Sequence, residues 1–308
     1  ILCKFEQMKK AIHAVLLLGI LFSITTANGQ IAMQDWRIHF SVFSGQGIAE
    51  TNDNIFLACS NGVIRYDLED NSVNELTVTN GLSDLGITSI AADESTAIVG
   101  YVSGNLDVIE GNTITNVPWI EKAEISGDKT IHNFCFDENY IYVATGIGLI
   151  LFDNDKKEIK DTYYPYEDPV VFDVAIYNDT LFAATDQGIY YAPKDRPFLN
   201  DQNQWEKKDD FPAAVVNGNF TQIEPFGGRI FYGYDDEIFN ADTIYYESNG
   251  VLSKLDETVN INAIYGDDDR LILSLFSTVK VLDTDLNEIQ TIFDYPDGTP
   301  LPEWVKVN

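Results

Sequence analysis

The chain repeats one unit, a β-strand followed by a glycine turn and a second strand. Its clearest copy spans residues 139–153, Asn-Tyr-Ile-Tyr-Val-Ala-Thr-Gly-Ile-Gly-Leu-Ile-Leu-Phe-Asp, and imperfect copies lie at 54–67, 96–109, 179–191 and 270–283. The turn glycines of the first four copies follow one another at intervals of 42, 44 and 40 residues, and they are Gly62, Gly104, Gly148 and Gly188. This period is typical of a four-stranded propeller blade.

The copy at 270–283 is the most divergent, because Thr278 occupies its glycine position. Thr278 lies 130 residues after Gly148, which corresponds to three periods of about 43 residues. One more blade is therefore expected between 188 and 278, and its best candidate is 229–240, where acidic residues replace the turn glycine. The sequence predicts an all-β fold, a β-propeller of four-stranded blades with six recognisable repeats. We expect an incomplete seven-bladed ring, with closure as a six-bladed ring as the alternative.

The segments that flank the repeats support this expectation. Residues 36–40 alternate in polarity, with Trp36, Ile38 and Phe40 on one face, and this pattern predicts a half-buried strand. In a propeller such a leading strand can complete the last blade and close the ring. The proline-rich stretch 294–304 leads to Asn308 before a seventh repeat. We therefore expect a propeller domain over 30–308, truncated at its carboxyl end.

The amino-terminal region has the pattern of a secretory signal. Lys9 and Lys10 precede an apolar run at 14–22, and small and polar residues follow up to Gly29. This pattern predicts a signal peptide over 8–29, with Met8 as initiator and 1–7 as upstream read-through. The run is too short for a membrane span, and no cysteine follows it to accept a lipid. We expect an exported protein at the cell surface or in the periplasm that does not span the membrane.

Charge and motifs exclude several classes of function. The 49 acidic and 19 basic residues give a net charge of −30, which argues against binding to nucleic acid or to an anionic membrane. Cys59 and Cys135 lie in different repeats and are expected to stay unbridged. No nucleophile elbow, zinc helix, phosphate loop or Cys-x-x-Cys pair occurs, and His39 has no signalled catalytic partner. The sequence predicts a protein that is not an enzyme and has no cofactor or metal.

The longest insertion between strands, 193–212, is the candidate recognition site. Long loops on a rigid scaffold often carry binding residues. It holds the densest basic group of the mature chain and one tryptophan, namely Lys194, Arg196, Lys207, Lys208 and Trp205. We interpret these five residues as candidate ligand contacts. The alternatives are a solvated loop of mixed charge and a tryptophan that packs on its own blade.

Two stretches carry a resemblance to known families. The stretch 80–93, Asn-Gly-Leu-Ser-Asp-Leu-Gly-Ile-Thr-Ser-Ile-Ala-Ala-Asp, resembles the Asn-Gly-Leu repeat of two-component-regulator propellers. Together with Trp-Arg-Ile-His-Phe-Ser at 36–41 and Val-Gly-Tyr-Val-Ser-Gly-Asn-Leu-Asp-Val at 99–108, it makes the chain similar to the amino-terminal propeller of the PorZ family, surface components of the type IX secretion system of Bacteroidetes.

The resemblance implies seven-bladed propellers, and it implies partnership with the sortase and the outer-membrane components of that system. It also implies binding of anionic lipopolysaccharide, and it offers no catalytic motif to carry over. Two alternatives stay open. One is the ligand-sensing ectodomain of a hybrid two-component regulator, and the other is a secreted glycan-binding or glycan-active protein.

Overall fold

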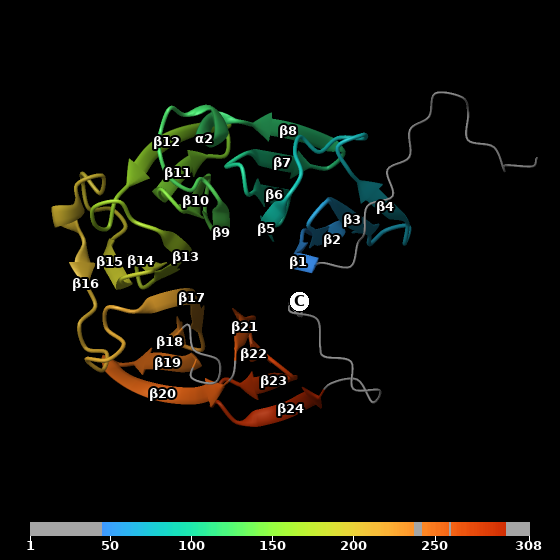
Figure 1. Cartoon of the computed structure of the whole chain (residues 1–308). Helices are drawn as coiled ribbons and strands as arrows, with labels where there is room; N and C mark the ends of the chain where they lie inside the picture. The colour runs from blue at the N-terminus through green and yellow to red at the C-terminus, as the bar shows by residue number, and fades with distance from the viewer. Residues whose placement is uncertain (1–44, 237–241, 259, 294–308) are drawn as a thin grey trace, which may run out of the picture. The chain divides into compact units, whose positions relative to one another are not determined.

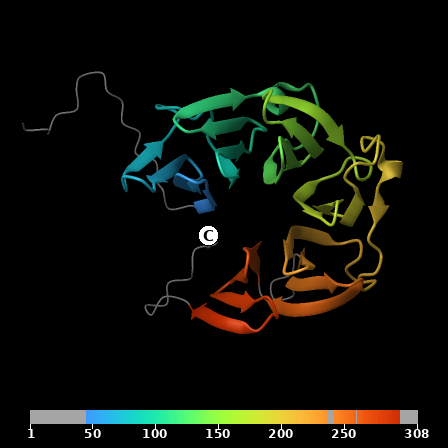
Figure 2. The ribbon, with the colours of Figure 1, turned by 180° about the vertical axis from the view of Figure 1, so that it is seen from behind.

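The computed structural model describes residues 45–293 except 237–241 and 259. These residues form six separate four-stranded antiparallel sheets, and each sheet consists of consecutive strands. Each sheet is a blade, and the six blades follow one another around a ring (Figures 1 and 2). Helix is confined in the described part to α2 (Trp119–Lys122) and the single 3₁₀ turn η1 (Gln202–Gln204). The described residues thus form a propeller of six blades, one for each recognised repeat, and the incomplete seventh blade stays a prediction.

The bounds of the strands in the first three blades are β1 Gly45–Glu50, β2 Asn54–Cys59, β3 Gly62–Asp67, β4 Val73–Leu76; β5 Ile87–Ala92, β6 Thr96–Tyr101, β7 Leu106–Glu110, β8 Thr113–Val117; β9 Ile131–Asp137, β10 Tyr140–Thr145, β11 Gly148–Asp153 and β12 Glu158–Tyr163. Those of the other three are β13 Val171–Tyr177, β14 Thr180–Thr185, β15 Gly188–Pro193, β16 Glu206–Lys207; β17 Asn219–Phe226, β18 Arg229–Asp235, β19 Asp242–Ser248, β20 Val251–Thr258; β21 Ile261–Gly266, β22 Arg270–Leu275, β23 Thr278–Asp283 and β24 Glu288–Phe293. The first strand of each blade lies at the centre of the ring (Figure 1).

The repeat positions in the sequence coincide with the turns of the central hairpins. Gly148 and Gly188 are the first residues of β11 and β15, and their φ angles are 122° and 110°. A Cβ on Gly188 would lie 2.5 Å from the carbonyl oxygen of Val216, so both conformation and space require glycine there. Thr278 begins β23, and Arg229 begins β18 of the blade that was expected between 188 and 278. The period therefore located every blade correctly.

In the blades between the first and the last, the central strands are apolar on both faces because each of these blades packs against a neighbour on either side. On β6, Val99 packs into the core shared with the first blade, and the adjacent Ile98 packs into the core shared with the third. On β10, Ile141 packs into the core shared with the second blade, and Tyr142 packs into the core shared with the fourth. Alternate side chains therefore serve alternate cores, which explains why β6 and β11 are buried along their whole length.

Every inner strand has an irregularity at its second residue, or at its third in β17, where one extra residue enters the ladder with the next strand. The extra residues are Gln46, Thr88, His132, Phe172, Thr221 and Asn262. We call these six the bulge residues. A bulge interrupts the regular register of the ladder at its extra residue and redirects the side chain. All six line the central cavity described below.

Some predictions fall outside the described residues and stay predictions. They are the signal peptide at 8–29, the read-through at 1–7, the strand at 36–40 with His39, and the segment from 294 onward. In the part of the chain that is described, no helix is both long and apolar enough to cross a membrane. Cys59 and Cys135 form no disulfide, as expected from their places in different blades.

Candidate functional site

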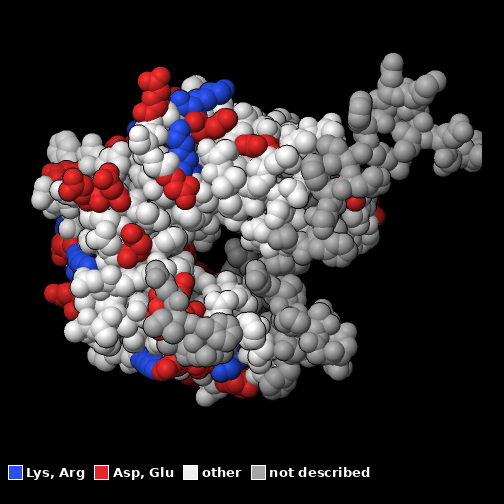
Figure 3. Space-filling view, viewed as in Figure 1, with Lys and Arg blue, Asp and Glu red and all other residues white. Residues whose placement is uncertain are grey.

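The principal cavity lies at the centre of the ring and measures about 890 Å³. Residues from the inner strands of all six blades line it. The space-filling view shows the ring hollowed at this point (Figure 3). The volume is in the range of pockets that bind small ligands.

Equivalent residues of neighbouring inner strands lie at one level around the cavity. The rings of the bulge residues His132 and Phe172 have centroids 5.2 Å apart. The hydroxyl of Thr88 donates to the carbonyl oxygen of Ile131 at 2.6 Å, one position before the next bulge. The bulge residues therefore form a ring of neutral groups, in which amide, hydroxyl, imidazole and phenyl side chains face the cavity.

Side chains next to the bulges hold the blades together. Asn133 donates from Nδ2 to Oδ1 of Asp173 at 2.6 Å, which joins the third and fourth blades. The other carboxylate oxygen of Asp173 accepts from the backbone N–H of Ile223 in the fifth blade at 2.9 Å. Gln222 then donates from Nε2 to the carbonyl oxygen of Ile261 in the sixth at 3.1 Å. These polar residues connect the scaffold, so Asp173 is not a free acid for catalysis.

The charge that lines the cavity is of one sign. Its charged residues are Glu50, Asp93, Glu94, Asp173 and Glu224, and no lysine or arginine is among the described lining residues. Walls with one sign of charge concentrate the field in a cleft. This negative charge therefore repels anionic polymers from the cavity, whereas water, cations and neutral molecules can enter it.

Two groups with catalytic potential face or adjoin the cavity, and both are held neutral. Burial lowers the pKa of His132, although the negative charge of Asp128 opposes this shift. Its Nε2 atom is buried and has no hydrogen-bond partner among the described residues. Burial raises the pKa of the Cys135 thiol to about 12, with a further contribution from the charge of Asp173. Such a thiol is a poor nucleophile at neutral pH because the reactive species is the thiolate.

The basic residues of the insertion point to different partners and do not form one cluster. Lys194 pairs with Asp137 of the third blade at 2.8 Å. Lys208 pairs with Glu247 of the fifth blade, and with Asp210. Each of these two cations thus bridges from the insertion to a neighbouring blade.

The remaining three candidates contact their own loop or blade. Arg196 pairs with Glu206 at 3.1 Å and also donates to the carbonyl oxygen of Gln204. Lys207 donates to the side-chain oxygen of Asn217 at 2.6 Å, and burial lowers its pKa. Trp205 is 7% exposed and donates from Nε1 to the carbonyl oxygen of Leu199 at 2.9 Å. A ligand would stack on Trp205 only after this loop opened.

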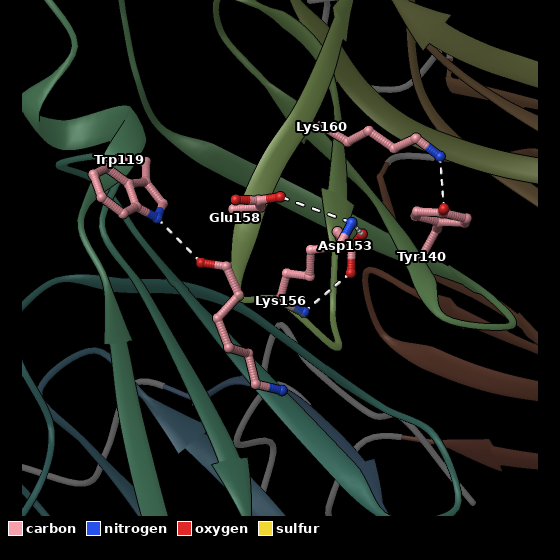
Figure 4. Close-up of polar contacts among 7 residues, drawn as sticks. Trp119, Tyr140, Asp153, Lys156, Glu158 and Lys160 are labelled. Carbon is pink, nitrogen blue, oxygen red and sulfur yellow. Dashed lines mark hydrogen bonds and ion pairs between the residues drawn. The ribbon is translucent and has the colours of Figure 1, made fainter.

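Sequence reasoning missed a more exposed group of basic and aromatic residues at the border of the second and third blades (Figure 4). Trp119 is 54% exposed, and its Nε1 donates to the carbonyl oxygen of Lys157 at 3.1 Å. Lys160 lies 3.8 Å from the centre of the Tyr140 ring and is not in an ion pair within the described residues. Lys156 pairs with Asp153, but its side chain is 65% exposed. The sequence signal that could have indicated this group was Lys-Lys-x-x-Lys at 156–160. It was not recognised because Trp119 lies far from these lysines along the chain.

A trio of carboxylates lies in the central hairpin of the fifth blade, where β18 ends and β19 begins. Oxygen atoms of Asp235, Asp236 and Asp242 lie within 4.8 Å of one another, the one such group among the described residues that a metal ion could bridge. Burial raises the pKa of Asp242, which also accepts a hydrogen bond from the backbone N–H of Ile261 at 3.1 Å. Through the hydrogen bond from Ile261, Asp242 joins the fifth blade to the sixth.

Comparison with known proteins identifies the propeller. Residues 55–206 match the family model described as the N-terminal β-propeller domain of PorZ of the type IX secretion system. Over this segment, which is just under half of the chain, the propeller is similar to the amino-terminal propellers of that family. The structure of PorZ from Porphyromonas gingivalis, an essential bacterial surface component of the type IX secretion system of that organism, superposes with a TM-score of 0.69 at 21% sequence identity. The alignment covers 82% of this chain and 33% of PorZ, so the chain spans about one third of PorZ.

More distant propellers share the fold alone. Hydrazine synthase of Kuenenia stuttgartiensis superposes with a TM-score of 0.56 at 13% identity, covering 83% of this chain and 81% of its own. BamB of Moraxella catarrhalis gives 0.51 at 11% identity, with 81% and 74% covered. No curated protein matches the chain in sequence. The PorZ-type match is therefore the one that bears on function.

Proposed function

We propose that the protein is a non-enzymatic surface component of a type IX secretion system, and that its propeller is a scaffold for the sortase and the outer-membrane components. The observation that carries the proposal is the match of residues 55–206 to the PorZ propeller family. The rigid ring, with polar residues joining successive blades, suits a protein that positions partners. The neutral His132 and the protonated Cys135 support a binding role over a catalytic one.

The proposal includes contact with anionic lipopolysaccharide, and the charge of the cavity favours a site outside it. The insertion residues Lys194, Arg196, Trp205, Lys207 and Lys208 stay candidates, although a ligand must compete with their present partners. Trp119, Lys156 and Lys160 form a second candidate surface, because an exposed indole can stack on a sugar and the exposed cations can approach phosphate or carboxylate groups (Figure 4).

Binding measurements with two variants separate these surfaces. The protein would be immobilised and exposed to purified sortase, to the outer-membrane components and to isolated lipopolysaccharide. The first variant replaces the four insertion cations with serine, and the second combines W119A, K156S and K160S. Because Lys208 bridges two blades and is largely buried, the melting temperature of the first variant must be measured alongside. Lys254→Ser is the matched control, since Lys254 is a half-exposed, ion-paired lysine on the fifth blade.

We expect the wild type and the control to bind equally, and one of the two surface variants to lose lipopolysaccharide selectively. Loss in the first variant assigns the insertion, and loss in the second assigns the border of the second and third blades. Failure of the wild type to bind any of the three probes would overturn the proposal and favour a ligand-sensing ectodomain.

A further inference from the structure

Phe198, within the insertion, combines two features that rarely occur together. Its side chain is 75% exposed, more than any other large hydrophobic residue that the structure describes. Its φ angle is +63°, in the left-handed region that bulky residues avoid. Leu286 is the other large apolar residue with positive φ in the described part, but it packs against the core between the last two blades. Phe198 gains no such packing.

The loop around Phe198 is held in place from both sides. Leu199 is buried, and its carbonyl oxygen accepts from the indole N–H of the buried Trp205 at 2.9 Å. The backbone N–H of Asp201 donates to the carbonyl oxygen of Phe198, also at 2.9 Å. Arg196 closes the loop through the carbonyl oxygen of Gln204. These contacts fix the strained backbone, so the phenyl ring projects from a fixed point of the loop.

Strained residues persist where the surrounding structure imposes them, and they cluster at binding sites. A loop whose backbone is already held loses little conformational entropy when a partner binds it. Aromatic anchors that enter a pocket dominate many protein interfaces. Phe198 has the properties of such an anchor.

The surroundings of Phe198 define the partner. Asp195 and Asp201 are exposed acidic residues of the same loop, and the charges of Arg196 and Glu206 offset each other in an ion pair. The local surface is therefore negative around one apolar projection. A second copy of this chain, with its net charge of −30, would be repelled from it.

We propose that Phe198 is the anchor of a docking surface for another protein, one that offers an apolar pocket with lysine or arginine at its rim. The inference rests on the proposed function in taking that protein to be a component of the secretion system. It assigns the exposed face of the insertion to a protein partner.

Phe198→Gly is the decisive variant, because glycine adopts positive φ without strain and removes the ring. We expect F198G to weaken binding of the purified secretion component roughly thirty-fold, as for an interface hot spot. Its melting temperature should equal or exceed that of the wild type. Val251→Ala is the matched control, since Val251 is 64% exposed on another blade, and it should bind like the wild type. Unchanged binding of F198G, or a lower melting temperature, would overturn the proposal.

A photo-crosslinking residue, p-benzoylphenylalanine, at position 198 tests the surface independently of the partner assumed. We expect one surface protein to be crosslinked from 198 and not from 251, and its purified form to prefer the wild type over F198G. If that protein lies outside the secretion system, the docking surface stands and the proposed function fails. If no adduct distinguishes position 198 from position 251, the docking surface is refuted whatever the function.

Discussion

Gly100 on β6 provides the most direct test of how tightly neighbouring blades pack. A Cβ atom built on Gly100 would lie 2.5 Å from Cγ2 of Ile131 in the next blade and 2.7 Å from Oγ of Ser89. Both distances are shorter than van der Waals contact, so Gly100→Ala must push the second and third blades apart. Overpacking of this kind costs about 1–3 kcal/mol. The reduced freedom of the unfolded chain returns about 0.4–1 kcal/mol, which leaves a net loss of roughly 1–2 kcal/mol.

Gly233 is the matched control, because it occupies the same position on β18, opposite Gln222 in the ladder. A Cβ there would lie 3.2 Å from Cβ of Gln222 and 3.4 Å from Cδ1 of Ile264, which small side-chain movements can relieve. We expect Gly233→Ala to leave stability unchanged within about 0.5 kcal/mol or to raise it slightly. Neither glycine has a positive φ, so conformational strain does not differ between the two.

Urea unfolding followed by tryptophan fluorescence measures both variants, and thermal melting provides a second reading. A loss of 1–2 kcal/mol corresponds to a fall in melting temperature of roughly 2–8 °C for a domain of this size. Equal stability of G100A and wild type would refute the packing argument. So would an equal loss in G233A, because the difference in spacing between the two sites would then have no effect.

Two further variants test the polar interior. Tyr101 is fully buried and donates to Oδ2 of Asp107 at 2.6 Å, and burial, with the charge of Asp107, raises its pKa far above the usual range. We expect Tyr101→Phe to cost about 1.5–3 kcal/mol in urea unfolding, and a loss below 0.5 kcal/mol would contradict the role of this bond. Burial lowers the pKa of His132 below its unfolded value near 6.5, so the unfolded state binds the proton more readily. Stability from this group is complete above about pH 6.5 and is lost as pH falls through the lower folded pKa. His132→Phe should therefore lose less stability than wild type between pH 7 and 5, and parallel profiles would show that His132 does not contribute.

The architecture could be predicted because propeller repeats are local in sequence. Each blade is a meander of consecutive strands, so the turn glycines of the first four central hairpins carry the period, and Thr278 of the last blade falls at the expected place. The blade between 188 and 278 was found at Arg229 from the period, although its turn has no glycine. The start of β19 at Asp242 was not predicted, because an acidic turn does not fix the length of a loop.

The candidate site could not be derived in the same way, because side chains find partners in neighbouring blades. Lys194 and Lys208 are 14 residues apart in sequence, yet one contacts Asp137 and the other Glu247. Charge density along the chain therefore overstated their grouping in space. Conversely, Trp119 and Lys157 are far apart in sequence but joined by a hydrogen bond. The bulge positions also could not be recognised in the sequence, since residues as different as Thr88 and Phe172 occupy them.

The bulge residues have a consequence for how this scaffold can change. A residue that enters the ladder as an extra member has no single residue opposite it, and the side chains of Thr88 and Asn262 instead donate to the carbonyl oxygens of Gly100 and Leu275. The six positions already hold two amides, two hydroxyls, an imidazole and a phenyl ring on one repeated backbone. The next residue of each inner strand, by contrast, faces only alanine, glycine or serine across the hairpin, because the neighbouring blade fills that space. Single substitutions at the bulge positions can thus change the chemistry at the centre of the ring one residue at a time. The small residues beside them, by contrast, must stay small because they set the spacing between blades.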